Sequence, residues 1–365
     1  MSSPKISVVM SVFNGQTFLS EAIESILGQT FRDFEFLIID DGSTDRTAEI
    51  LSTIAQSDGR IQIVSRSNKG RAISLNVGIN LAAGKYIGRM DADDVALPRR
   101  LEQQVTFMEQ HPGVVLLGGA VELISAAGQR LHTVKQPLED AQIRTAMLSH
   151  SPIYHPTAVM RKESVLAAGG YRKPLLDADD YDLWLRMAEL GKLANLSQVV
   201  LRYRVHADQV SLRGMKQQTL CVLAARAASR LRACGSPDPL SEAKEVTPQL
   251  LNALGVKHAE IQQGILRNYN DWVEVVERCD PGAALWMTED FLRQADQGCI
   301  GRTALASGWL RAARIHYKQG RRARALFCAG RAVLARPIIA GRPLKKAYAQ
   351  VAAAPIDAKE TPRLR

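Results

Sequence analysis

The chain of 365 residues is 46% hydrophobic, which is ordinary for a soluble globular protein of about two domains. Its net charge of +10 is uneven, because residues 1–214 carry −1 whereas residues 215–365 carry +11. The sequence has no uninterrupted apolar run of about 18 residues, so a transmembrane helix is not predicted.

Strand-like and helix-like segments alternate through residues 1–110. Short apolar runs predict strands at residues 6–12, 34–39, 61–64 and 86–90. Apolar residues at helical spacing predict helices at residues 18–27, 44–55, 72–83 and 98–110. Ser43 or Thr44 is expected to cap the second of these helices. The alternation predicts an α/β fold with a mostly parallel, Rossmann-like sheet flanked by helices.

The rest of the chain shows two kinds of residue pattern, one of mixed strands and helices and one that is helical. Residues 114–134 are β-like, with turns expected at Gly118-Gly119 and at Ala127-Gly128, and residues 181–190 and 199–205 predict a helix and a strand. Residues 215–355 are rich in Ala, Leu and Arg and lack clear strands, which predicts a helical region with a hairpin around Gly320. We therefore expect a first domain at residues 1–214, a basic α-helical domain at residues 215–351 and a disordered tail at residues 352–365.

Acidic residues follow the second and fourth predicted strands. They are Asp40 and Asp41, and the run Asp91-Ala92-Asp93-Asp94. Ligands bind beyond the carboxyl ends of the strands in parallel sheets, so we expect both clusters in one crevice. Clustered carboxylates suit a hard divalent cation such as Mg²⁺ or Mn²⁺, bound together with diphosphate oxygens. A solvated acidic turn is the alternative interpretation of the second cluster.

Four sequence motifs resemble those of glycosyltransferase family 2. The stretch 6–45, which ends in Asp-Asp-Gly-Ser-Thr-Asp, looks like the opening of that family. The run 84–94 resembles its Asp-x-Asp motif, the run 176–184 is similar to its Glu-Asp motif, and the run 203–206 (Tyr-Arg-Val-His) resembles its closing motif. The motifs occur in the order of the family and cover about residues 5–212. The resemblance implies a GT-A fold, a nucleotide-sugar donor and inversion at the anomeric carbon.

The resemblance also assigns residues to the nucleotide side of the site. Asp41 matches the position that hydrogen-bonds the uracil of a UDP donor, so UDP is the expected nucleotide, with GDP and dTDP left open. Asn14 matches a loop position beside the nucleotide, and Lys69 and Arg71 match a loop that borders the base and the diphosphate. Each assignment has a structural alternative. In these alternatives, Asp41 would cap the following helix, Asn14 would be a plain turn residue, and Lys69 would belong to a solvated basic loop.

The Asp-x-Asp match assigns a metal site. Asp93 matches the residue that touches the metal, Mg²⁺ or Mn²⁺, and Asp91 matches the one near the ribose or reaching the metal through water. Asp94 is expected to be a structural neighbour. His206 matches a histidine that ligates the same metal in some relatives, although a lone histidine is more often structural.

The Glu-Asp match assigns the catalytic base. Inverting transfer needs a carboxylate that takes the proton from the attacking acceptor hydroxyl, and Asp180 matches that residue. The sequence departs from the family because Asp179 stands where the motif has Glu, which leaves open which of the two carboxylates is the base. Asp182 is expected on the helix surface. Trp184 is expected in the core, with an aromatic facing a sugar as the alternative.

The basic excess is strongest at residues 302–365, which hold 15 Lys and Arg against two Asp and Glu. Such a helical region either docks on an anionic membrane surface or is a solvated face. No nucleic-acid partner is expected, since aromatic residues are only 5% of the chain. The five cysteines are odd in number and widely spaced, which favours a reducing cytoplasm. The predicted location is cytoplasmic, with peripheral association at the inner face of the cytoplasmic membrane.

These observations predict an inverting glycosyltransferase. It would move a hexose-type sugar from a nucleotide sugar to a glycan or lipid-linked acceptor in polysaccharide or envelope glycan biosynthesis. One alternative is a catalytically inactive binding or scaffold protein that acts through the basic helical region. Nucleotidyl transfer, a second enzyme class, is disfavoured because the loop after the first strand lacks a Gly-rich phosphate-binding pattern.

Overall fold

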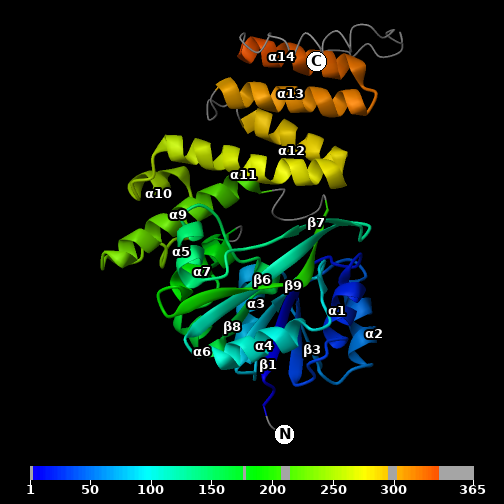
Figure 1. Cartoon of the computed structure of the whole chain (residues 1–365), viewed down its shortest axis with the longest axis vertical. Helices are drawn as coiled ribbons and strands as arrows, with labels where there is room; N and C mark the ends of the chain where they lie inside the picture. Colours follow the sequence, from blue (N-terminus) through cyan, green and yellow to red (C-terminus); the bar gives the residue numbers. More distant parts are fainter. Residues whose placement is uncertain (1–2, 176–177, 207–213, 295–301, 337–365) are drawn as a thin grey trace. The chain divides into compact units, whose positions relative to one another are not determined.

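The computed structural model describes residues 3–175, 178–206, 214–294 and 302–336. The chain divides into two compact units, one made of Met1–Val205 with Leu220–Val256 and the other of His206–Thr219 with Lys257–Arg365 (Figure 1). Each unit is described by itself below. The tail predicted at residues 352–365 lies outside the described residues.

A single mixed sheet organises the first unit. Among the described residues, nine strands pair in the order β3-β2-β1-β4-β8-β6-β9-β5, with β7 on β6. The strands are β1 (Ile6–Val12), β2 (Phe34–Asp40), β3 (Ile61–Ser65), β4 (Tyr86–Met90), β5 (Val95–Ala96), β6 (Val114–Ser125), β7 (Arg130–Val134), β8 (Val159–Arg161) and β9 (Lys192–Val205). Strands β1 to β4 are parallel to one another, whereas β8 is antiparallel to both β4 and β6. The predicted α/β fold is confirmed.

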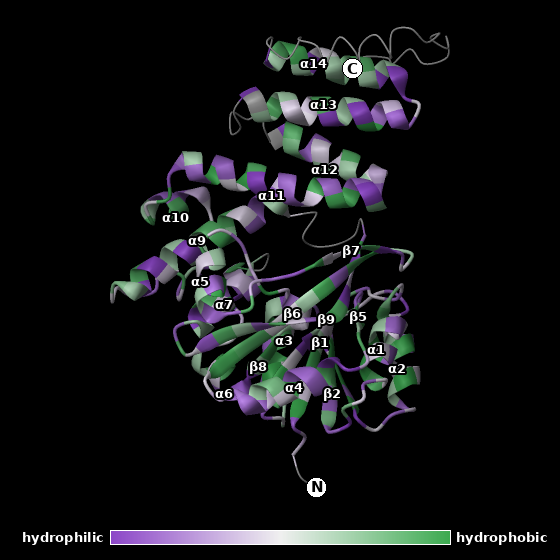
Figure 2. Cartoon of the chain, in the orientation of Figure 1, coloured by the Kyte–Doolittle hydropathy of each residue, from purple (hydrophilic) through white to green (hydrophobic). Residues whose placement is uncertain are grey.

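Helices cover the sheet and are joined to it by apolar side chains. Those of the first unit are α1 (Leu19–Leu27), α2 (Thr47–Ala55), α3 (Arg71–Leu81), α4 (Arg100–Gln110), α5 (Asp140–Met147), α6 (Lys162–Ala167), α7 (Asp179–Met187), α10 (Pro248–Ala253) and most of α9 (Met215–Ala233). The central strands are strongly hydrophobic (Figure 2) because both of their faces are covered. One buried cluster joins Leu37 and Ile87 of the sheet to Leu75 of α3 and Trp184 of α7.

Two local expectations are wrong. Gly118-Gly119 is no turn, because β6 continues through it, and a Cβ at Gly118 would lie 2.1 Å from the Asn195 Oδ1 atom. The glycines allow β9 to approach closely. The second helix begins at Thr47, not after a cap at Ser43 or Thr44.

The second unit is helical in its described part. It contains α11 (His258–Cys279), α12 (Pro281–Gln294), α13 (Arg302–Lys318) and α14 (Arg322–Ala335). Helices α13 and α14 form the predicted hairpin, with Gly320 at a φ of +77° in the connection. The predicted helical C-terminal region is therefore confirmed. None of the helices within the described ranges is long and apolar enough to cross a membrane.

Candidate active site

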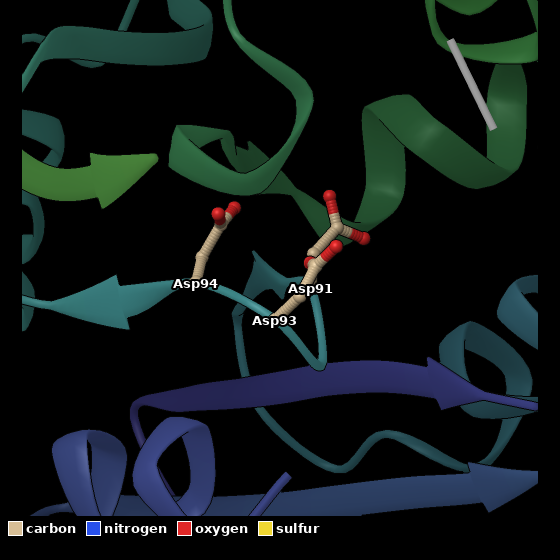
Figure 3. Close-up of side chains that lie close together, drawn as sticks. All are labelled: Asp91, Asp93 and Asp94. Carbon is tan, nitrogen blue, oxygen red and sulfur yellow. The ribbon is translucent and has the colours of Figure 1, made fainter. Parts of the chain in front are cut away.

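The acid loop, residues 91–94, begins where β4 ends. Asp91, Asp93 and Asp94 each offer an oxygen, and these oxygens lie within 4.8 Å of one another. Figure 3 shows the three carboxylates projecting from the same side of the loop. Three negative charges at this spacing repel one another and need nearby positive charge.

Buried arginines surround the acid loop. Arg89, the penultimate residue of β4, is 1% exposed and pairs with the Asp91 carboxylate. Arg100 of α4 is equally buried and donates to the Arg89 carbonyl at 2.6 Å. Burial lowers the pKa of Arg100 to about 10, with a partial offset from the Asp94 charge, so its guanidinium is still charged at pH 7. The backbone N–H of Arg204 donates to the Asp94 Oδ1 atom at 2.8 Å.

The loop fits a divalent cation. Burial raises the pKa of Asp94 well above its usual range, and the charges of Asp93 and Asp91 raise it further. Burial also raises the pKa of Asp91, with a partial offset from Arg89. The Asp94 Oδ2 atom is buried and accepts no hydrogen bond from the described residues. An all-oxygen donor set with excess negative charge suits Mg²⁺ or Mn²⁺. His206 is not one of the three residues of this cluster and begins the second unit.

Asp179 and Asp180 are the first two residues of α7, and Arg71, at the start of α3, pairs with Asp179. Two Arg71 nitrogens lie 2.7 and 3.3 Å from the two Asp179 oxygens, and Asp179 is fully buried. Burial, the largest single effect, lowers the pKa of Arg71, but the charge and hydrogen bonds of Asp179 together with the other nearby carboxylates outweigh it, so the pKa is raised. The Asp91 and Asp180 charges also act on Arg71, which links the two acidic motifs.

Asp180 is the less constrained member of the pair. Its Oδ1 atom accepts from the Tyr181 backbone N–H at 2.7 Å, and its side chain is only partly buried. Burial and the neighbouring Asp179 charge raise the pKa of Asp180 to about 6, against a lowering effect of Arg71. Asp180 is therefore mostly ionised at pH 7 and can accept a proton.

The Asp41 carboxylate accepts hydrogen bonds at the beginning of α3 and does not cap α2. The alternative that Asp41 caps the helix following it is therefore wrong. Its Oδ1 atom accepts from the Lys69 backbone N–H at 3.0 Å and from the Ser74 hydroxyl at 2.8 Å. Its Oδ2 atom accepts from the Gly70 backbone N–H at 2.8 Å. Asp41 thus holds the loop that carries Lys69, whose side chain is exposed.

Asn14 joins the loops that follow β1 and β2. Its side-chain oxygen accepts from the Thr44 backbone N–H at 2.8 Å, and its own N–H donates to the Ser43 hydroxyl at 3.0 Å. Its φ of +53° is a left-handed conformation that asparagine tolerates. Asn14 is therefore more than a plain turn residue, because it sets the relative position of two loops at the carboxyl edge of the sheet.

Two residues of α7 test the remaining expectations. Asp182 is not on the helix surface; it is fully buried and accepts two hydrogen bonds from Arg186, at 2.6 and 3.0 Å. Trp184 is also fully buried, which confirms its place in the core. The aromatic side chain therefore does not face a sugar.

Sequence reasoning assigned no role to Arg89, Arg204 or His155. The His155 Nε2 atom lies 3.2 Å from the Arg89 Nε atom and 2.8 Å from the Tyr171 hydroxyl oxygen. Burial lowers the pKa of His155 well below its usual range, and the charges of Arg89 and Arg71 lower it further, so it is neutral at pH 7. The missed signal for the arginines was their place in otherwise apolar strands, where a charge must be paired.

Comparison with known proteins agrees with this geometry. Residues 7–169 match the sequence profile of Glycosyl transferase family 2. An uncharacterized glycosyltransferase of Haemophilus influenzae is 36% identical over 221 residues, covering 57% of this chain and 68% of the relative. The amylovoran biosynthesis glycosyltransferase AmsE of Erwinia amylovora is 34% identical, covering 57% and 79% of the two chains. The O-antigen biosynthesis glycosyltransferase WbnJ of Escherichia coli is 33% identical, covering 55% and 80%.

The fold comparison extends further along the chain. The crystal structure of S. aureus TarS 1–349 in complex with UDP matches with a TM-score of 0.53 at 16% identity, covering 95% of this chain and 91% of that one. The protein is a transferase with a GT-A-like α/β fold. It belongs to glycosyltransferase family 2, as its motifs predict.

Proposed function

We propose that the protein is an inverting glycosyltransferase. It would transfer a hexose-type sugar from a UDP-sugar to a glycan or lipid-linked acceptor in polysaccharide or envelope glycan biosynthesis. The observation that carries this proposal is the bridge made by Arg71, which pairs with Asp179 and also interacts with Asp91 and Asp180. It brings the residues expected to face the donor diphosphate next to the residues expected to face the acceptor. The names of AmsE and WbnJ support polysaccharide assembly, and the UDP complex of TarS supports the donor class.

The base of the reaction would be Asp180. Asp179 has both oxygens held by Arg71 and is fully buried, which leaves Asp180 as the carboxylate that an acceptor can reach. The acceptor hydroxyl passes its proton to Asp180 while its oxygen bonds to the anomeric carbon. The bond from that carbon to the diphosphate oxygen breaks, and the nucleoside diphosphate leaves with the electron pair. Asp179 is then a positioning residue, set by Arg71.

A divalent ion, Mg²⁺ or Mn²⁺, would be held by Asp93, with Asp91 close to the ribose or bridged to the ion by water. When bound, such an ion stabilises negative charge on the departing diphosphate. The support is the crowding of the three acid-loop carboxylates and the unpartnered Asp94 Oδ2 atom. The resemblance of its motif alone supports His206 as an additional ligand of this ion.

The nucleotide would bind between the loops that Asn14 and Asp41 hold. Among the described residues, two donors bond to the Asp41 Oδ1 atom, which Arg66 also approaches to 3.7 Å, and one bonds to Oδ2. A carboxylate has about four acceptor positions, so a position on the Oδ2 atom would accept the N–H of a uracil. Lys69 presents an exposed cation on the same loop and would bind the diphosphate. Arg71 would also attract the same diphosphate.

Helix α14 would bind the inner face of the cytoplasmic membrane. Phe327 and Leu334 are 60% and 79% exposed and lie seven residues apart, which places them on one helix face. The exposed Arg321 and Arg324 precede them. Apolar side chains beside basic ones suit the interface of an anionic bilayer.

Sedimentation with vesicles tests this surface. The full chain should bind phosphatidylglycerol vesicles better than phosphatidylcholine vesicles, and the double variant Phe327→Ser, Leu334→Ser should lose most of that binding. Leu148→Ser is the matched control, since Leu148 is 77% exposed on the first unit. Equal binding by the double variant and the control would argue against the surface.

Calorimetric titration of UDP, GDP and dTDP, with and without Mn²⁺, tests the proposed function. We expect Mn²⁺-dependent binding of UDP that Asp93→Ala abolishes and that Asp33→Ala, at an exposed acid before β2, leaves intact. Binding of another nucleotide would revise only the donor. Absence of any nucleotide binding would refute the enzyme and favour the scaffold alternative.

A further inference from the structure

Arg204, near the end of β9, is a buried cation whose contacts reach three other segments. Its side chain is 2% exposed. Its Nε atom donates to the Asp93 carbonyl at 2.7 Å and its Nη1 atom to the Ala126 carbonyl at 3.0 Å. Its Nη2 atom donates to the Glu21 carboxylate at 2.6 Å. The guanidinium therefore joins the acid loop, the β6–β7 turn and helix α1.

The acid loop is held by this residue at two successive positions. Besides the bond to the Asp93 carbonyl, the Arg204 backbone N–H donates to the Asp94 Oδ1 atom at 2.8 Å. The guanidinium carbon also lies 4.6 Å from the centre of the Phe18 ring, which covers its face. These contacts fix both the backbone and one carboxylate of the loop.

The chemistry of the side chain suits this task. Asp91, Asp93 and Asp94 repel one another, and a loop with that charge would spread apart if nothing held it. An arginine stays charged even when buried and presents its donors in a rigid fork. A lysine has the same charge but cannot reach three acceptors in that planar arrangement. Glu21 is 57% exposed, lies outside the acid loop and accepts the third side-chain hydrogen bond of Arg204.

We propose that Arg204, supported by Glu21, is a positioning residue that fixes the acid loop for a divalent ion and the donor diphosphate. The inference rests on the proposed function, because it assumes that the acid loop binds the ion. Arg204 acts through Asp93 and Asp94 and is not itself placed against the donor. Loss of a residue that orients metal ligands typically weakens metal affinity about 10- to 100-fold.

The experiment measures Mn²⁺ affinity of the full chain, from the free-ion signal in electron paramagnetic resonance, and UDP affinity with and without Mn²⁺. The variants are Arg204→Lys and Glu21→Gln. Their controls are Arg202→Lys, two residues away on β9 and paired with Glu122 at 3.1 Å, and Glu24→Gln, an exposed acid of α1. Thermal unfolding of each variant establishes that it is folded.

We expect Arg204→Lys to weaken Mn²⁺ binding by about tenfold or more, Glu21→Gln to weaken it less, and both controls to match the wild type. If Arg204→Lys fails to fold, Glu21→Gln decides, because its exposed side chain can be changed without opening the core. Folded variants with the Mn²⁺ affinity of the wild type would overturn this inference alone. A wild type that binds no Mn²⁺ would overturn the proposed function and this inference with it.

Discussion

The pH dependence of transfer gives the sharpest prediction. The pKa of Asp180 is raised to about 6, first by burial and then by the Asp179 charge. A base with this pKa is about 90% ionised at pH 7 and about 10% ionised at pH 5. Protonation removes the base, so kcat/KM should fall roughly tenfold between pH 7 and pH 5, with a midpoint near pH 6.

Arg71→Met turns this prediction into a test of the geometry. Arg71 lowers the pKa of Asp180 and pairs with Asp179, so without it the two carboxylates should take up their first proton at higher pH. The midpoint of the kcat/KM profile should then move above that of the wild type, whatever the variant does to the maximal rate. Arg99→Met, at an exposed arginine paired with its helix neighbour Glu102, is the control and should leave the midpoint unchanged.

The assay is release of nucleoside diphosphate at low concentrations of a hexose donor that carries the nucleotide identified by calorimetry, from pH 5 to pH 8, with thermal unfolding followed at each pH. Two results would refute the reasoning. One is a wild-type profile that is flat between pH 5 and pH 7. The other is an Arg71→Met midpoint at or below that of the wild type.

Further predictions concern stability and nucleotide binding. Asp182→Ala leaves the buried Arg186 without its carboxylate partner and should destabilise the first unit by about 3 kcal/mol, seen as a lower unfolding temperature; a value below 1 kcal/mol would contradict it. Gly118→Ala places a Cβ 2.1 Å from the Asn195 side chain and should cost about 1–3 kcal/mol in chemical denaturation, whereas Gly113→Ala, with open space around its Cβ position, should be nearly neutral. Ser74→Ala removes the hydroxyl that donates to Asp41, and UDP affinity should fall about fivefold in calorimetry without loss of folding. Unchanged affinity would show that this hydrogen bond does not orient Asp41 for the uracil.

Local patterns in the sequence determined most of the elements of residues 1–110. Strand β1 is observed at the residues that its apolar run predicts, and the acid loop follows β4 as expected. These features are local, because side-chain period and turn residues depend on neighbours along the chain. The edge of the sheet that would carry the site followed from the alternation of strands and helices.

Only the tertiary structure decided which charges meet. Arg71 and Asp179 are 108 residues apart in sequence, and the Arg204 N–H and the Asp94 side chain are 110 apart. Periodicity contains no information about such pairs, since a buried arginine is stabilised by whichever acceptors the fold brings to it. The same holds for Gly118-Gly119, where a turn signal lies inside a strand because β9 approaches too closely for side chains. Sequence thus determined where the acids stand, and packing determined the partners that hold them in place.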